Sequence, residues 1–350
     1  MDAPSGMVSA QATGIGARSS THLVVRFSTT LTLAIGLVMV ALAPVAAQDE
    51  PEELAPEPAI IMPLAVKSLL LDATTAGDTL VAVGERGHVL TSTDGGDSWR
   101  QSEVPTRSML TAVTFHDDHL GWAVGHDSAI LRTEDGGVTW RLVNWAPEEE
   151  APFFDVWFAD ADNGIAVGAY GSFYRTVDGG ESWDFEPIGD ADWHLHHIAQ
   201  AEDGTLYMAA EAGVIYRSDD GGSTWSELPS PYEGSFFGVL PLGGDAALVY
   251  GLRGHLFRTE DRGENWTGID TGTVAMLTSG ARLADGTVVI AGLGGTVLTS
   301  NDDGRSFTLY QQKARRGISS VTDLGNGELL LTGEFGVRTT SVAELAAAAQ

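Results

Sequence analysis

The sequence predicts an all-β fold, a seven-bladed β-propeller whose blades are four-stranded antiparallel sheets. Three observations predict it: a turn motif that recurs six times, a spacing of 41 to 43 residues between its copies, and a glycine-containing signature with a seventh copy. A repeat of about 40 to 45 residues is typical of one propeller blade.

Composition excludes several classes of protein. The 350 residues include 19 Lys and Arg against 48 Asp and Glu, which gives a formal charge of −29, and there is no cysteine. Without cysteine there is no disulfide framework, thiolate metal site or cysteine nucleophile. Phosphate binding needs a positive surface, so nucleic acid is not an expected partner of such an acidic chain.

The N-terminal residues 1–47 have the pattern of a secretory signal peptide. Arg18 and Arg26 precede an apolar run at 31–43, and small residues at 45–47 offer a cleavage site. A retained N-terminal anchor is the alternative, although the run is shorter than the roughly 20 residues that span a bilayer. No cysteine follows it, which excludes a lipid-modified cysteine. We therefore expect an exported, periplasmic protein, with an acidic, Pro-rich linker at 48–58.

The recurring turn motif is Ser/Thr-x-Asp-x-Gly-x-Ser/Thr-Trp/Phe, first seen at residues 92–99 as STDGGDSW. We expect it to join the last two strands, C and D, of each blade. Its aspartate can accept hydrogen bonds from the turn, its glycines supply positive φ, and its aromatic residue packs between sheets. These structural aspartates are Asp94, Asp135, Asp178, Asp220, Asp261 and Asp302, and the aromatic residues are Trp99, Trp140, Trp183, Trp225, Trp266 and Phe307.

A second signature, a Gly-x-x-Gly-like step followed by β-branched and aromatic residues, precedes each motif, as at 84–90 and 251–258. In the second unit, strands are predicted at 110–115 (A), 121–124 (B), 129–133 (C) and 140–143 (D), and the signature lies between B and C. It occurs again at 333–338, where no Asp motif follows. The sequence therefore contains seven units, and the last of them lacks strand D.

The ends of the repeat region predict how the ring closes. Residues 342–350 form a helix-prone tail, so they cannot supply the missing strand. The β-like run at 59–66 (AIIMPLAV) is unassigned, and we expect it to close the ring as the fourth strand of the last blade. The predicted propeller then spans residues 59–341.

The six motifs match the Asp-box, or BNR, repeat, and the fifth has Asn265 where Ser or Thr is usual. This repeat is shared by sialidases, other glycosidases, receptors and assembly factors, so it indicates fold more than function. The whole repeat unit, which runs from the Gly-x-x-Gly-like signature through the Asp box, resembles that of the photosystem II stability/assembly factor family. The repeat period and the number of units, seven, also resemble that family. The resemblance covers about residues 59–341 and implies a non-catalytic propeller that binds partner proteins through arginines on one face.

Sorting charges by loop gives a candidate for such a face. In a propeller, the B–C loops and the D–A connections between blades share one face. Seven basic residues fall on this face, six of them in units seven, one and two and Arg253 in unit five. We call the whole set the basic arc: Lys67, Arg86, Arg107, Arg253, Lys313, Arg315 and Arg316. Tyr170 and Phe335 lie in B–C loops of the same face as candidate aromatic anchors. Exposed arginine and aromatic residues are enriched at interface hot spots.

Other chemistry-bearing residues have simpler interpretations. Arg132, Arg175, Arg217 and Arg258 precede four Asp boxes at equivalent places, so we expect a structural role in separate blades. The stretch 193–197 (WHLHH) places His194 and His196 on one face of a strand, as zinc ligands would be, but no third ligand is evident. We predict no metal and no cofactor.

These patterns favour a monomeric, exported, non-catalytic propeller that binds a protein, as an assembly factor or scaffold for an envelope membrane complex. The partner is expected to be a membrane protein or its exported segment, with the basic arc docking on acidic residues. One alternative is an Asp-box glycosidase, which needs two carboxylates about 5–10 Å apart. Another is a propeller that binds a glycan without catalysis, through residues such as Trp193 and Tyr170.

Overall fold

The computed structural model describes residues 55–189, 191–325 and 327–349. The predicted signal peptide and most of the predicted linker lie outside these residues. None of the described helices is long and apolar enough to cross a membrane.

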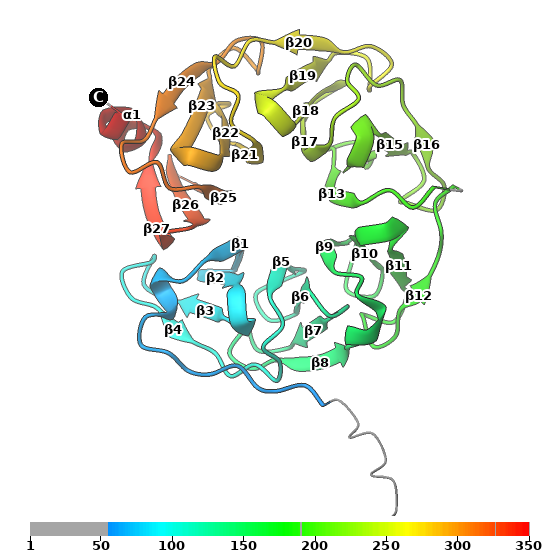
Figure 1. Ribbon diagram of the computed structural model, residues 1–350, viewed down its shortest axis with the longest axis vertical. Helices are drawn as coiled ribbons and strands as arrows, with labels where there is room; N and C mark the ends of the chain where they lie inside the picture. The colour runs from blue at the N-terminus through cyan, green and yellow to red at the C-terminus, as the bar shows by residue number, and fades with distance from the viewer. Residues whose placement is uncertain (1–54, 190, 326, 350) are drawn as a thin grey trace, which may run out of the picture. The chain divides into compact units, whose positions relative to one another are not determined.

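Seven small antiparallel sheets form a ring, which confirms the predicted seven-bladed propeller (Figure 1). Six sheets have four strands and the seventh has three, and in each sheet the strands pair in the order of the chain. The first strand of every blade lies innermost and the last lies at the rim (Figure 1).

The blades have the following strands. Blades 1 to 3 comprise β1 (Leu70–Ala76), β2 (Thr79–Gly84), β3 (Val89–Ser92), β4 (Arg100–Gln101); β5 (Leu110–Phe115), β6 (Gly121–Gly125), β7 (Ile130–Thr133), β8 (Arg141–Asn144); and β9 (Phe153–Phe158), β10 (Gly164–Gly168), β11 (Phe173–Thr176), β12 (Asp184–Phe185). Blades 4 and 5 comprise β13 (Leu195–Gln200), β14 (Leu206–Ala210), β15 (Ile215–Ser218), β16 (Ser226–Glu227); and β17 (Phe236–Gly243), β18 (Ala246–Gly251), β19 (Leu256–Thr259), β20 (Thr267–Ile269). Blades 6 and 7 comprise β21 (Leu277–Arg282), β22 (Val288–Gly292), β23 (Thr296–Ser300), β24 (Thr308–Gln311); and β25 (Ile318–Gly325), β26 (Glu328–Gly333), β27 (Gly336–Ser341).

Short helices occupy the loops. Single 3-10 turns form most B–C loops, and the others lie before β1 and after β8: η1 (Ala65–Lys67), η2 (Glu85–Gly87), η3 (Pro147–Glu149), η4 (Ala169–Gly171), η5 (Glu211–Gly213), η6 (Leu252–Gly254) and η7 (Leu293–Gly295). The C-terminal tail forms α1 (Val342–Ala349).

The hydrophobic core lies between the blades. The second strand of a blade is short and rich in Val, Ile and Ala, and every residue of β6, β10 and β14 is buried. Such a strand has both faces covered, because each sheet packs between two neighbouring sheets. Each apolar cluster therefore joins adjacent blades, as where Val83 of blade 1 meets Val113 and Leu131 of blade 2.

The predicted closure by a strand at 59–66 is wrong: the seventh blade has three strands and these residues form none. Pro63 interrupts the run and has no N–H to donate to a sheet. The segment lies along blade 1 instead, where the Ala59 N–H donates to the Val104 carbonyl (2.9 Å) and the Met62 N–H to Gln101 Oε1 (2.8 Å).

Side chains and α1 complete the seam between blades 7 and 1. The Ser320 hydroxyl donates to Asp72 (2.8 Å) and the Thr322 hydroxyl to the Ala73 carbonyl (2.7 Å). Helix α1 packs against β24 and β27. Its Leu345 is buried, and the Leu345 carbonyl accepts a hydrogen bond from Gln312 (2.8 Å). The helix therefore covers a flank that other blades cover with a fourth strand.

Hydrogen bonds between loops define two faces of the ring. On one, which we call the arc face, a B–C loop meets a D–A connection, as where the His126 N–H donates to the Met109 carbonyl (2.8 Å). On the other, the box face, a C–D turn meets an A–B turn, as where the Gly136 N–H donates to the His119 carbonyl (3.0 Å).

Candidate functional site

The Asp boxes form closed hydrogen-bond networks on the box face. Asp178 accepts hydrogen bonds from the Ser182 hydroxyl (2.6 Å), the Ser182 N–H (2.9 Å) and the Thr176 hydroxyl (2.8 Å). These bonds lower the pKa of Asp178 to about 2. In the fifth box, the Asn265 amide replaces the usual hydroxyl and donates to Asp261 (2.8 Å). The box carboxylates are thus occupied by their own turns.

The arginines that precede four boxes connect neighbouring blades. Each donates to a backbone carbonyl in the box of the next blade: Arg132 to Gly179, Arg175 to Gly222, Arg217 to Arg262 and Arg258 to Asp303. Each also pairs with a carboxylate, and Arg258 pairs with Glu260 (2.6 Å) and Asp303 (3.0 Å). Their charges are therefore neutralised within the fold.

A β-bulge interrupts the innermost strand of all seven blades at the same place. In blade 1, Leu70 pairs with Gly84 and Asp72 with Val83, so Leu71 has no partner. The residues skipped in this way are Leu71, Thr111, Phe154, His196, Phe237, Thr278 and Ser319. A bulge breaks the alternation of a strand, so the skipped residue and the next one both face the channel.

The bulges explain the first glycine of the Gly-x-x-Gly signature. A Cβ atom on Gly125 would lie 2.0 Å from the Met109 carbonyl oxygen, and one on Gly251 would lie 2.3 Å from that of Ser235. Strand A approaches strand B too closely there for a side chain. Ala210 occupies the equivalent position of blade 4, so one blade accommodates a methyl group.

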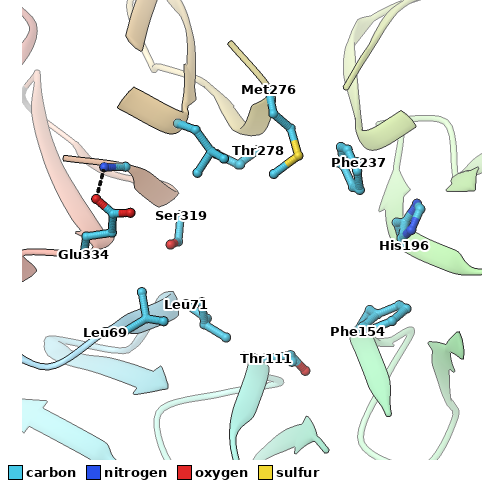
Figure 2. A pocket seen from close by; sticks show the side chains of 12 residues that line it. Leu69, Leu71, Thr111, Phe154, His196, Phe237, Met276, Thr278, Ser319 and Glu334 are labelled. Carbon is cyan, nitrogen blue, oxygen red and sulfur yellow. Dashed lines mark hydrogen bonds between the residues drawn. The ribbon is translucent and has the colours of Figure 1, made fainter. Parts of the chain in front are cut away.

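The seven skipped residues surround the mouth of the central channel, where a cavity of about 520 Å³ opens between the blades (Figure 2). Leu69, Met276, Leu293 and Gly317 continue this lining. The Thr111 and Thr278 hydroxyls donate to the Phe153 (2.8 Å) and Ile318 (2.7 Å) carbonyls of the next blades. With these hydroxyls engaged, the lining is largely apolar.

The residues that follow the bulges form a polar floor below the mouth. Asp72, Asp155, His197, Ser279 and Ser320 surround a second cavity of about 160 Å³. Asp72 accepts from the Val113 N–H (3.0 Å) and Asp155 from the Ile198 N–H (2.8 Å), so each carboxylate bonds to the next blade. Burial raises the pKa of Asp72 to about 6 and that of Asp155 to about 7.

The histidines of the 193–197 stretch are part of this lining. His196 Nδ1 lies 2.8 Å from the Phe236 carbonyl oxygen, and His197 Nδ1 accepts from the Val239 N–H (3.4 Å). Burial lowers the pKa of His197 to about 4. Within the described residues there is no cluster of three His, Asp or Glu side chains that could hold a metal ion. The bulge at His196 also turns both His196 and His197 into the channel, whereas strict alternation would place them on opposite faces of the strand.

The basic arc residues lie exposed on the arc face. Lys67 lies in η1, Arg86 in η2 and Arg253 in η6, while Lys313, Arg315 and Arg316 lie between β24 and β25. Among the described residues, these six have no carboxylate within 4.0 Å. The nearby Glu85 and Glu334 accept instead from the Leu69 (3.3 Å) and Gly317 (2.8 Å) N–H groups.

Three of the candidate residues are engaged with the rest of the chain. Arg107 pairs with Glu57 (2.5 Å) and donates to the Pro58 carbonyl (3.0 Å). Tyr170 is 60% exposed and packs edge-on to His194, with ring centroids 4.9 Å apart. Phe335 is half-buried beneath the Arg338 guanidinium (4.6 Å), which makes Tyr170 the more accessible aromatic residue.

Comparison with known proteins identifies the family. The model described as "Photosynthesis system II assembly factor YCF48" matches residues 97–153 and 146–336, more than half of the chain. The chain belongs to this YCF48 family. The resemblance inferred from the Asp boxes is thereby confirmed.

Individual YCF48-type proteins match parts of the chain. The photosystem II assembly protein Ycf48 of Synechococcus sp. (strain JA-3-3Ab) is 41% identical over 131 residues, covering 36% of this chain and 39% of that protein. The assembly lipoprotein Ycf48 of Picosynechococcus sp. is 39% identical over 145 residues, covering 41% and 42%. The chain thus spans about two fifths of the length of these curated relatives.

A solved structure described as YCF48 bound to D1 peptide shares the fold. It superposes with a TM-score of 0.66 at 18% identity, covering 83% of this chain and 98% of that one. At this identity the likeness shows the propeller fold alone.

Sequence reasoning missed the two rings of residues in the channel. The bulge position carries five residue types in seven blades, from Leu71 to His196 to Ser319, so no motif marks it. A usable signal was the first glycine of Gly-x-x-Gly, whose missing Cβ indicates a close approach of two backbones.

Proposed function

We propose that this chain is an exported, non-catalytic propeller that binds a partner protein as an assembly factor or scaffold for an envelope membrane complex. Membership of the YCF48 family supports an assembly role. The relative whose structure is described as bound to D1 peptide supports a partner that offers a peptide segment. The docking surface is the basic arc, and the partner segment is acidic.

One observation carries this proposal: the arginines that precede the boxes are paired with carboxylates, whereas six of the arc cations are not, in the part of the chain that the structure describes. On the box face, Arg132, Arg175, Arg217 and Arg258 each pair with a carboxylate of the chain. On the arc face, six exposed cations have no such partner among the described residues of a chain with formal charge −29. Unpaired cations attract an acidic partner and steer its approach, and salt weakens that attraction.

A charge-reversal pull-down tests the proposal. Arg86→Glu, Arg315→Glu and Arg316→Glu are combined, and Arg107 is left unchanged because it holds Glu57 and Pro58. The control reverses two exposed arginines away from the arc, Arg100 and Arg282, which have no carboxylate partner among the described residues. Both variants and the wild type are used as bait in envelope extracts of the native host, read by mass spectrometry.

The expected result is a membrane complex captured by the wild type and the control variant and lost from the arc variant. Capture must also weaken steeply between about 50 and 200 mM salt, because the arc cations are exposed. Equal capture by all three proteins would contradict docking through the arc. An empty capture with the wild type would contradict the assembly role itself.

Location is part of the same proposal. We propose that the chain is exported to the periplasm, works as a monomer, and is either released from its apolar N-terminal run or tethered by it. The name of one relative includes lipoprotein, whereas this chain contains no cysteine for lipid attachment. Fractionation of the host with an antibody against the propeller distinguishes soluble from membrane-bound protein.

The glycosidase alternative has one observation in its favour, because Asp72 and Asp155 line the same cavity with raised pKa values of about 6 and 7. A raised pKa is what a general acid needs. Two observations oppose it: both carboxylates accept backbone N–H groups, and the cavity of about 160 Å³ is smaller than usual ligand pockets of about 300–1,000 Å³. Hydrolysis assays and a glycan array test both sugar-directed alternatives.

A further inference from the structure

The mouth of the central channel is a preformed pocket. Its lining consists of the bulged residues, which are held by neighbouring strands yet have no pairing partner of their own. Its volume of about 520 Å³ lies within the range of sites that bind small ligands or side chains. The polar floor, where Asp72 and Asp155 bond to neighbouring blades, limits its depth. The pocket therefore suits an apolar group that enters from the arc face.

One side of this mouth is an aromatic wall on blades 3 to 5. From the exposed Tyr170, ring contacts continue through His194 (4.9 Å) to Phe154 (5.9 Å). They continue from Phe154 to His196 (5.7 Å) and on to Phe237 (4.8 Å). Figure 2 shows Phe154, His196 and Phe237 side by side around the opening. Rings in this arrangement offer a large, rigid apolar surface.

The opposite side of the mouth adjoins the basic arc. Gly317 and Leu69 line the cavity, Arg316 precedes Gly317, and Lys67 is two residues before Leu69. Leu293 forms an apolar lip here and is 41% exposed. Glu334 is the carboxylate of this lining, and it accepts from the Gly317 N–H (2.8 Å). An occupant thus meets aromatic rings on one side, and on the other side lining residues that Lys67 and Arg316 adjoin in the chain.

The chain's own N-terminal segment shows how an acidic segment can bind to an arc cation. Glu57 pairs with Arg107 (2.5 Å), the Pro58 carbonyl accepts from Arg107 (3.0 Å), and the Ala59 N–H donates to the Val104 carbonyl (2.9 Å). The segment has no helix or strand at 55–62. A segment outside helices and strands, with a carboxylate on an arc cation, is therefore a mode of binding that this face already accepts.

We propose that the channel mouth receives an aliphatic or aromatic side chain of an extended acidic partner segment, whose flanking carboxylates pair with arc cations at 313–316 and Lys67. This inference rests on the proposed function and adds its recognition rule, an apolar anchor between acids. Charge complementarity with the rim selects the flanking residues, and the apolar lining selects the anchor. A basic or wholly polar segment satisfies neither.

Two synthetic peptides test the rule. Acetyl-Glu-Asp-Glu-Phe-Glu-Asp-Glu-amide and the same peptide with Ser in place of Phe carry equal charge and differ in the anchor. Their affinities for the full chain are measured by calorimetry or fluorescence anisotropy at about 50 mM salt. Burial of one Phe side chain predicts at least about tenfold tighter binding of the Phe peptide.

Variants locate the anchor site. Leu293→Glu places a charge on the lip and is expected to bring the ratio of the two affinities close to one. Val274→Glu is the matched control, because Val274 is 85% exposed and does not line the cavity, and it should keep the ratio. The combined Arg315→Glu and Arg316→Glu variant should weaken both peptides while leaving their ratio unchanged.

The outcomes separate the two proposals. Equal binding of the Phe and Ser peptides to the wild type would overturn the apolar anchor and leave docking through the arc intact. A ratio that survives Leu293→Glu would also overturn it, because the anchor would then sit elsewhere. Absence of binding by either peptide overturns recognition of acidic segments here, whereas the assembly role is decided separately by the pull-down.

Discussion

The box face and the arc face are built from the same repeat, but they differ in how similar the side chains are from one blade to the next. On the box face, one network recurs six times, with an aspartate held by its own turn and, in four blades, an arginine bridging to the next box. On the arc face, the bulges recur in every blade, yet the residues at the bulges and in the loops differ.

This difference separates contacts that recur around the ring from residues that are found in one blade only. A contact that is repeated around the ring serves the packing of one blade on the next, as the Asp boxes do. A residue that occurs once, such as His196 in the mouth or Arg316 on its rim, makes one sector of the face unlike the others. Binding of one partner in one orientation needs such asymmetry.

The largest loss of stability is expected from a substitution at the box face. Trp122 is fully buried, stacks on Phe158 with ring centroids 3.4 Å apart, and donates to the Gly179 carbonyl (2.9 Å). Trp122→Ala should lower the free energy of unfolding by about 3–5 kcal/mol, since it leaves a cavity in the core and removes a buried hydrogen bond. Denaturant unfolding followed by circular dichroism measures the loss.

Leu293→Ala on the arc face is the counterpart of that variant. Leu293 is 41% exposed, so its truncation should change the free energy of unfolding by about 0.5 kcal/mol or less. It should nevertheless weaken binding of the Phe peptide. If both variants lost similar stability, the division between a structural face and a recognition face would be wrong.

A smaller effect on stability is expected from replacing one arginine on each face by methionine. Arg258 is 5% exposed and holds Glu260, Asp303 and a box carbonyl, whereas Arg316 is exposed without a carboxylate partner among the described residues. Arg258→Met should cost about 1–2 kcal/mol of stability and leave partner capture unchanged. Arg316→Met should do the reverse, with an unchanged melting temperature and weaker capture. A loss of capture with Arg258→Met alone would show that the box face also binds.

Much of the ring could be predicted because its repeats are local. In blade 2, strands were predicted at 110–115, 121–124, 129–133 and 140–143, and they lie at 110–115, 121–125, 130–133 and 141–144. Turn glycines and alternating apolar residues act within a few residues, so they mark strand ends directly.

Closure of the ring and the channel lining could not be predicted in the same way. The run at 59–66 has strand-like composition, but its place depends on Pro63 and on α1, which packs beside β27. Asp72 and Asp155 face the channel because of the bulges, and the alternation of side chains along a regular strand does not predict this. Both features depend on contacts between distant residues, which a pattern of local spacing does not contain.

The smallest effect sharpens a second comparison, between the carboxylates of the boxes and those of the channel floor. Hydrogen bonds lower the pKa of Asp94 and Asp178 to about 2, so these groups stabilise the fold above pH 4 and lose that contribution as pH falls toward 2. Burial raises the pKa of Asp155 to about 7, so the folded state takes up its proton more readily than the unfolded state. Asp155 therefore costs stability as pH rises from about 4 through 7.

The variant Asp155→Asn isolates the contribution of Asp155 to the pH dependence of stability. Between pH 5 and 7, stability of the wild type relative to the variant should fall by about 1 kcal/mol per pH unit, since one pKa unit corresponds to about 1.4 kcal/mol. His197, whose Nε2 lies 4.0 Å from Asp155 and whose pKa burial lowers to about 4, acts in the opposite direction over this range and is present in both proteins. The comparison is made by denaturant unfolding at several pH values, with Asp178→Asn as the control. That control should diverge from the wild type below pH 4 instead, because its carboxylate is already ionised throughout the higher range.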